Sequence, residues 1–132
     1  MLEHTADVGI RSSGQDLEEA FEEVAKGMFS IITDISLVDS DIKRKVEIKA
    51  YNSESLLVNF LSELIYLHEV NNEVYGDFDI SITENEQITL KGDCLGERID
   101  LDKHDMDTAV KAVSYHELEV DPKGEIKIIL DI

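Results

Sequence analysis

Short runs in which apolar and polar residues alternate open and close this 132-residue chain. Residues 6–11 alternate near the start, and residues 126–132 alternate at the other end. Because side chains alternate across a strand, each run predicts a strand that carries Asp7 or Asp131 opposite its main apolar face. If the two strands pair, the two carboxylates converge. The apolar positions are Ala6, Val8 and Ile10 in the first run, and Ile126, Ile128, Leu130 and Ile132 in the last.

Two longer stretches carry apolar residues at the spacing of an α-helix. Asp16 is placed to cap a helix that runs from Leu17 to about Ile32. Asn52 or Ser53 can cap a second helix, which the asparagines at 71–72 end. The second helix has a wide apolar face, so we expect it to lie centrally, packed on a sheet. That face consists of Leu56, Leu57, Phe60, Leu61, Leu64, Ile65 and Leu67.

The segments between and after the helices predict further strands. Residues 45–50 alternate, with Val46, Ile48 and Ala50 expected to face inward. Residues 78–82 and 88–90 form two more alternating runs. The acidic turn at 84–86 joins these two runs, which is typical of a β-hairpin.

The last third of the chain predicts a loop followed by two strands. Residues 95–108 are polar and irregular and therefore predict a loop with at most a turn of helix. Residues 110–120 alternate again, and Asp121-Pro122-Lys123-Gly124 has the composition of a tight turn into the final strand. The expected shared face of residues 110–120 comprises Ala112, Ser114, His116, Leu118 and Val120.

These elements together predict an α+β domain. Two helices would pack on a mostly antiparallel sheet of five to seven strands, giving two layers around one core. No repeat, low-complexity tract or linker divides the sequence, so we expect residues 1–132 to form a single domain.

Charge restricts the classes of partner. Thirty acidic residues against twelve basic ones give a formal net charge of −18. A field of this sign repels a phosphate backbone, which argues against direct, extensive binding of nucleic acid. A basic protein partner or metal cations would suit the charge better, and a solvated acidic surface without specific meaning is the equally weighted alternative.

Other features of the sequence indicate the cellular setting. The single cysteine, Cys94, cannot form an internal disulfide or a cysteine-based metal site. A reducing compartment, the cytoplasm, is the simplest expectation. No apolar run approaches the roughly 18 residues that a membrane-spanning helix needs, so we expect no membrane association.

The converging carboxylates suggest a metal site. Calcium and magnesium prefer oxygen ligands, commonly carboxylates supplemented by main-chain carbonyls. Asp7 and Asp131 offer two carboxylates, and Ile132 adds main-chain and terminal oxygens. On composition alone, two aspartates far apart in sequence are more often ordinary surface charge.

Other familiar sites fail on spacing. Residues 100–111 resemble a calcium-binding loop, but Asp105 stands where glycine is required and Lys111 where glutamate is required. The glycines never form a Walker A or dinucleotide motif. No pair of histidines has the spacing of a zinc protease, although His4 could orient a neighbouring carboxylate. The four histidines are His4, His68, His104 and His116.

Four segments carry a resemblance to a known family. His4-Thr5-Ala6-Asp7-Val8-Gly9-Ile10 opens the chain, and a helix over 17–33 with Asp34 after it follows. Lys111-Ala112-Val113-Ser114-Tyr115-His116 and the terminal Leu130-Asp131-Ile132 come later. In this order, over essentially the whole chain, they closely resemble the archease family. Ser114 stands where the family has threonine, which keeps the hydroxyl.

The resemblance implies a helper protein and not an enzyme. Archeases contain a small α+β module (SHS2 type) inserted into a larger sheet. They assist the GTP-dependent RNA-splicing ligase (RtcB type) in tRNA splicing and RNA repair. They promote guanylylation of the ligase and multiple turnover, and they broaden its nucleotide use. An alternative implied role is that of a chaperone-like modulator of a tRNA methyltransferase or another RNA-modifying enzyme.

The resemblance also assigns residues. The family's metal site transfers to Asp7, Asp131 and the oxygens of Ile132, with a calcium-like divalent ion for which Mg²⁺ or Mn²⁺ can substitute in the cell. Lys111 matches a lysine on which the family's activity depends, and His4 is a second supporting residue. A hydrolase that uses Asp7 and His4 is the least favoured class, because the chain shows no nucleophile motif.

Overall fold

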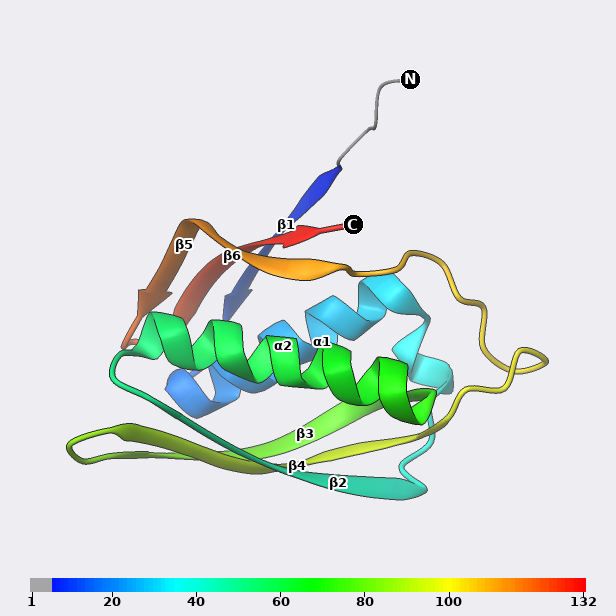
Figure 1. Ribbon diagram of the computed structural model, residues 1–132, viewed down its shortest axis with the longest axis horizontal. Helices are drawn as coiled ribbons and strands as arrows, with labels where there is room; N and C mark the ends of the chain where they lie inside the picture. The colour runs from blue at the N-terminus through cyan, green and yellow to red at the C-terminus, as the bar shows by residue number, and fades with distance from the viewer. Residues whose placement is uncertain (1–5) are drawn as a thin grey trace.

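The computed structural model of this protein describes residues 6–132 (Figure 1). Two α-helices, one 3₁₀ helix and six strands follow one another along this part of the chain. Their order is β1 (Asp7–Ser13), α1 (Leu17–Ile32), η1 (Ile35–Leu37), β2 (Ile42–Ala50), α2 (Ser53–Asn71), β3 (Glu73–Glu84), β4 (Ile88–Arg98), β5 (Ala112–Asp121) and β6 (Glu125–Asp131).

The strands form two separate antiparallel sheets, with the two helices between them (Figure 1). One sheet has the order β1-β6-β5 and the other the order β2-β4-β3. The α+β class and the antiparallel pairing are as the sequence predicted. The strands are, however, divided between two sheets, so the helices are covered on two sides. No helix within residues 6–132 has the length and apolar character needed to cross a membrane.

Helix α1 begins and ends where its sequence indicates. The Asp16 carboxylate accepts a hydrogen bond from the Glu19 backbone N–H at 2.8 Å, which satisfies one of the free donors of the first turn. At the other end the Thr33 N–H donates to the Phe29 carbonyl at 2.9 Å. The buried stripe of α1 consists of Ala20, Phe21, Val24, Ala25, Met28, Phe29 and Ile32.

Helix α2 contacts strands of both sheets. Asn52 caps it by accepting from the Ser55 N–H at 2.8 Å, and Asn72 ends it in the left-handed conformation, with φ 55°. Its wide apolar face is explained by contacts with both sheets, as the sequence predicted for a central helix. Each fully buried leucine or phenylalanine contributes about 1.5–3 kcal/mol relative to an exposed position. The buried residues are Leu56, Leu57, Val58, Phe60, Leu61, Leu64 and Ile65.

Strands β2, β3 and β4 are longer than the sequence predicted, and β3 covers Glu73–Glu84 where a strand over 78–82 was expected. Strand β2 begins at Ile42, and β4 continues through Arg98, so residues 95–98 are strand and not loop. Residues 95–98 were predicted to be loop because the stretch that they begin is polar and lacks regular alternation. Gly96 packs directly against the backbone of Val74 and Tyr75 on β3, and this close approach of two chains requires a residue without a side chain.

Strand β5 contains a bulge that breaks its expected alternation. Its register against β6 shifts between Ser114 and Glu119, and Glu117 lies in the left-handed region with φ 54°. Val113 therefore packs on the core together with Leu118, although the two positions differ in parity. The predicted shared face is therefore confirmed for Leu118 and Val120 but wrong before the bulge, where Val113 takes the inward position and Ala112 is exposed.

Candidate functional site

Asp7 and Asp131 lie directly opposite each other. Strands β1 and β6 pair antiparallel, and their register matches Asp7 with Asp131. Directly paired residues on antiparallel strands have Cβ atoms about 4.5–5.5 Å apart on the same face of the sheet. The Asp7 side chain is exposed and Asp131 is half-buried at the sheet margin. Two carboxylates from opposite ends of the described chain are thus neighbours.

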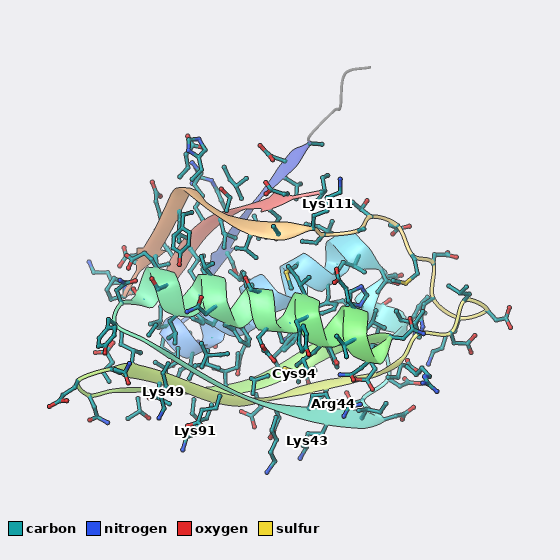
Figure 2. The ribbon with its side chains drawn as sticks, viewed as in Figure 1. Lys43, Arg44, Lys49, Lys91, Cys94 and Lys111 are labelled. Atoms are coloured by element: carbon teal, nitrogen blue, oxygen red, sulfur yellow. The ribbon has the colours of Figure 1, made fainter. Side chains whose placement is uncertain are left out.

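Three segments meet at this end of the sheet. The Ile132 N–H donates to the Ala6 carbonyl at 3.0 Å, which continues the β1–β6 pairing to the last residue. The Lys111 N–H donates to the Asp131 carbonyl at 2.7 Å, and Ala112 is paired with Asp131. Figure 2 shows Lys111 at the start of β5, close to the end of β6. The residues proposed from the sequence therefore gather in one place, apart from His4, which lies outside the described residues.

A second pair of directly opposed aspartates, on the other sheet, can be compared with the Asp7–Asp131 pair. Asp79 and Asp93 are also directly opposed, on β3 and β4. There, Lys45 of β2 is paired with Asp93 and offers a compensating charge. Beside Asp131 the register places Ala112, which offers none. Like charges directly opposite each other are unfavourable, so a bound cation would relieve the Asp7–Asp131 pair.

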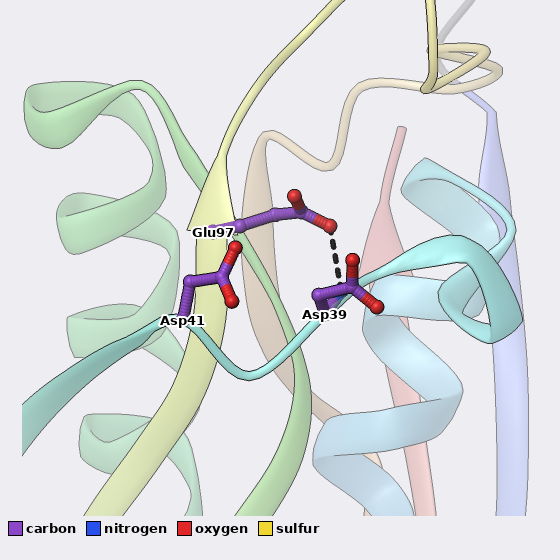
Figure 3. A group of neighbouring side chains, drawn as sticks. All are labelled: Asp39, Asp41 and Glu97. Atoms are coloured by element: carbon purple, nitrogen blue, oxygen red, sulfur yellow. Dashed lines mark hydrogen bonds between the residues drawn. The ribbon is translucent and has the colours of Figure 1, made fainter.

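A separate cluster of carboxylates also has the spacing of a possible metal site. Asp39 and Asp41 precede β2, and Glu97 is near the end of β4 (Figure 3). One ligand oxygen from each lies within 4.8 Å of the others. The Asp39 N–H also donates to Glu97 Oε2 at 2.6 Å. The sequence did not reveal this cluster, because Glu97 is far from Asp39 and Asp41 along the chain and the three belong to no metal-ligand motif.

The histidines in the described part of the chain do not converge. His68 donates its Nδ1–H to the Glu73 carbonyl at 2.7 Å and packs edge-on against Phe29, which is a structural role. His104 belongs to the segment after β4 and is buried, and His116 is exposed on the β5 bulge. Within residues 6–132, the one group of three or more potential metal ligands is the Asp39–Asp41–Glu97 cluster.

A partly buried ion-pair network was also not foreseen from the sequence. Arg44 donates two hydrogen bonds to the Glu73 carboxylate, at 2.9 and 2.7 Å, and the Tyr75 hydroxyl donates a third at 2.7 Å. The Arg44 guanidinium lowers the pKa of Glu73, while burial raises the pKa of Tyr75. The buried carboxylate of Glu73 and the buried hydroxyl of Tyr75 are thereby satisfied, which is a structural role.

Several exposed lysines lie on the outer face of the β2-β4-β3 sheet. Lys43 and Lys49 extend from β2 and Lys91 from β4 (Figure 2). Acidic residues interrupt this face, and Lys91 pairs with Glu47 at 3.9 Å. Strand β2 is also a sheet edge, where lysines commonly prevent pairing with other chains. The arrangement indicates edge protection and not a continuous basic patch.

Cys94 has no catalytic environment. Its side chain is fully buried on β4, and burial raises the pKa of the thiol to about 12. Only a thiolate is an effective nucleophile, so this cysteine is inert near neutral pH.

The fold and its acidic strand ends define a small α+β protein with paired carboxylates where the described chain begins and ends. The model of the Archease protein family matches residues 1–132. The chain therefore belongs to the archease family.

Individual relatives agree with this assignment. The chain is 40% identical to protein archease of Pyrococcus furiosus over 120 residues, which cover 90% of this chain and 84% of that protein. It is 39% identical to protein archease of Sulfurisphaera tokodaii over 128 residues, covering 97% and 91% of the two chains.

Two solved structures share the fold. The solution structure of Methanobacterium thermoautotrophicum protein 1598 superposes with a TM-score of 0.83 at 34% identity, covering 99% of this chain and 96% of that one. A crystal structure described as an archease and possible chaperone, from Thermotoga maritima, superposes with a TM-score of 0.56 at 18% identity, covering 100% and 95%. The second likeness concerns the fold alone.

Proposed function

We propose that this protein activates a GTP-dependent RNA-splicing ligase of the RtcB type, through a divalent cation held by Asp7, Asp131 and main-chain oxygens of Ile132. The observation that carries the proposal is the direct cross-strand pairing of Asp7 with Asp131. Membership of the archease family supports the choice of partner. The protein acts as an accessory factor, and the ligase performs the chemistry.

The donor set suits a hard cation. Carboxylate and carbonyl oxygens are the ligands that Ca²⁺ and Mg²⁺ prefer, and Asp7 and Asp131 belong to adjacent strands of a regular sheet. Main-chain hydrogen bonds on both sides of Asp131 hold its backbone in place. When bound, the cation supplies positive charge that can interact with phosphate oxygens at the ligase.

Surface charge favours association with such a ligase. The ligase gathers phosphates, so the rim of its active site is expected to be basic. A partner with a formal charge of −18 would be drawn to that rim, which increases the rate of encounter. Lys111, beside Asp131, is the one basic residue that we place in the contact, where it would face a phosphate or a carboxylate of the ligase.

Ligase turnover tests this proposal. RNA joining is counted per ligase molecule, with ligase from the same organism, GTP and Mn²⁺, in the presence of wild-type protein or the Asp7→Asn or Asp131→Asn variant. Each variant should stimulate RNA joining at least tenfold less than the wild-type protein does. Asp79→Asn is the matched control, because Asp79 is also paired with an aspartate but lies on the other sheet. Full stimulation by both site variants would refute the proposal.

A chaperone-like role towards a tRNA methyltransferase or another RNA-modifying enzyme is the second candidate. Its structural support is the exposed apolar pair Tyr66 and Val70, one turn apart on α2 and 57% and 62% exposed. Light scattering by a heated methyltransferase, with and without this protein, tests it. Replacement of both residues by serine should abolish protection if this role is the main one, and should leave ligase stimulation intact.

A further inference from the structure

The segment between β4 and β5 connects the two sheets without regular secondary structure. Residues 99–111 leave the end of β4 and cross to the start of β5, in the β1-β6-β5 sheet (Figure 1). A segment outside helices and strands must satisfy its backbone polar groups through other contacts. Those contacts determine where Lys111 lies relative to Asp131.

Lys103 occupies the carboxylate cluster at the first half of this segment. Its ammonium Nζ lies 2.7 Å from Asp39 Oδ2 and 2.8 Å from Glu97 Oε2. Glu97 Oε1 accepts from the same ammonium at 3.0 Å. The lysine thus supplies to two of the three carboxylates the positive charge that a metal ion would otherwise provide.

His104 forms a hydrogen bond to the Glu97 carboxylate from the buried side. Its ring is 1% exposed, and Nδ1 accepts from the Asp100 N–H at 3.0 Å. The proton of the neutral ring therefore resides on Nε2, which donates to Glu97 Oε2 at 3.2 Å. Although burial raises the pKa of Glu97, the hydrogen bonds from Lys103, Asp39 and His104 outweigh it and lower that pKa to about 2.

The second half of the segment is fixed to helix α1 and then to β6. The buried Thr33 hydroxyl donates to the Asp105 carbonyl at 2.8 Å, and the Asp107 N–H donates to the Ile32 carbonyl at 2.8 Å. Val110 is buried in the core, and the next residue, Lys111, donates its N–H to Asp131. The segment is therefore anchored at several separate points between Glu97 and Lys111.

We infer that Lys103 is a positioning residue: by closing on Glu97 and Asp39 it holds residues 99–111 in place and sets Lys111 against Asp131. The Asp39–Asp41–Glu97 cluster is then the anionic half of a clasp and not the protein's metal centre. The importance of this clasp for ligase activation rests on the proposed function, whereas its effect on the position of Lys111 does not.

Amide hydrogen exchange measured by NMR tests the clasp without the ligase. In Lys103→Met, exchange of the Lys111 N–H should accelerate at least tenfold more than exchange of the Ile132 N–H, which bonds to Ala6 in the same sheet. A general loss of stability would accelerate exchange of both amides alike, so the ratio of the two accelerations reports the local effect. Lys91→Met is the matched control, since within residues 6–132 Lys91 forms one surface ion pair, with Glu47, and it should leave both amides unchanged.

Two further variants keep the test decisive if Lys103→Met folds poorly. Lys103→Arg retains the charge and should keep the Lys111 amide protected. Asp39→Asn removes the negative charge of an exposed partner of Lys103 and should accelerate exchange at Lys111 by a smaller factor. Unchanged exchange at Lys111 in both Lys103→Met and Asp39→Asn would overturn the inference, as would equal acceleration at Lys111 and Ile132.

A double-mutant comparison separates the clasp from the proposed function. If Lys103 acts through Lys111, Lys103→Met should not reduce ligase stimulation further in a Lys111→Met background. Independent, additive losses would contradict the clasp even if the Asp7 and Asp131 variants behave as proposed. If those aspartate variants stimulate fully, the proposed function fails, and the exchange data still decide whether Lys103 positions Lys111.

Discussion

Asp7 faces Asp131 directly across the β1–β6 pair, with the neutral Ala112 as the next neighbour in the sheet. The arrangement places two negative charges together at a sheet margin without a basic residue in register. Repulsion between the two carboxylates lowers the stability of the protein without a metal ion, and a bound cation raises it. Removing one of the charges should therefore stabilise the metal-free protein and reduce the stabilisation by metal.

Replacing Asp7 by asparagine should therefore have opposite effects with and without metal. In chelator the variant should be more stable than the wild type by about 0.2–1 kcal/mol, because the repulsion is removed. In excess Ca²⁺ the wild type should gain about 2.7 kcal/mol when the ion is at a hundredfold its Kd, and the variant should gain far less. Urea unfolding in the two buffers measures both effects, and equal calcium responses would contradict the site.

Gly9 offers a way to block the site's surroundings without disturbing the fold. It lies two residues from Asp7 on the same face of β1, and a Cβ added there would meet no other atom within 4 Å. Gly9→Leu should change the free energy of unfolding by less than about 1 kcal/mol. If this face contacts the ligase, the variant should nevertheless bind it at least tenfold more weakly. Unaltered affinity in a titration would place the contact elsewhere.

The Glu97–Lys103 pair predicts a defined pH dependence. The pKa of Glu97 is lowered to about 2 from the ordinary value near 4.3, so its contribution is complete above about pH 4.5 and is lost as the pH falls towards 2. Lys103→Met should cost about 1–2 kcal/mol at pH 7, a modest value because Lys103 is partly exposed. The difference from wild type should shrink between pH 4.5 and 2. A constant difference over that range would contradict the pairing.

The Arg44–Glu73–Tyr75 network should matter for stability and not for activation. Glu73→Ala leaves the buried Tyr75 hydroxyl without its acceptor and Arg44 without its bidentate partner. We expect a loss of about 2–3 kcal/mol in the free energy of unfolding. Ligase stimulation per folded molecule should remain within twofold of wild type. A specific loss of stimulation would show that this network takes part in activation.

Features controlled by local sequence could be predicted well. The cap at Asp16, the end of α2 at residues 71–72 and the strand character of β1 and β6 follow from hydrogen-bonding groups or alternation within a few residues. The pairing of β1 with β6 joins opposite ends of the described chain, and the sequence offered it only as a condition for the two carboxylates to meet. The division of the strands into two sheets could not be predicted, because it depends on which faces of the buried helices each strand covers.

Non-local features escaped sequence reasoning. The clasp joins Asp39 to Glu97 and Lys103, and the partly buried network joins Arg44 to Glu73, so neither has a local motif. The bulge in β5 was missed because one residue in the left-handed conformation, Glu117, reverses the parity of everything after it.

The location of a bound cation tests the central claim most directly. Crystals of the full chain grown with Mn²⁺ as a probe would show the ion through its anomalous scattering. The proposed function predicts the strongest peak at roughly 2.0–2.6 Å from carboxylate oxygens of both Asp7 and Asp131. A strongest peak among Asp39, Asp41 and Glu97, with none between Asp7 and Asp131, would contradict both the metal site and the clasp.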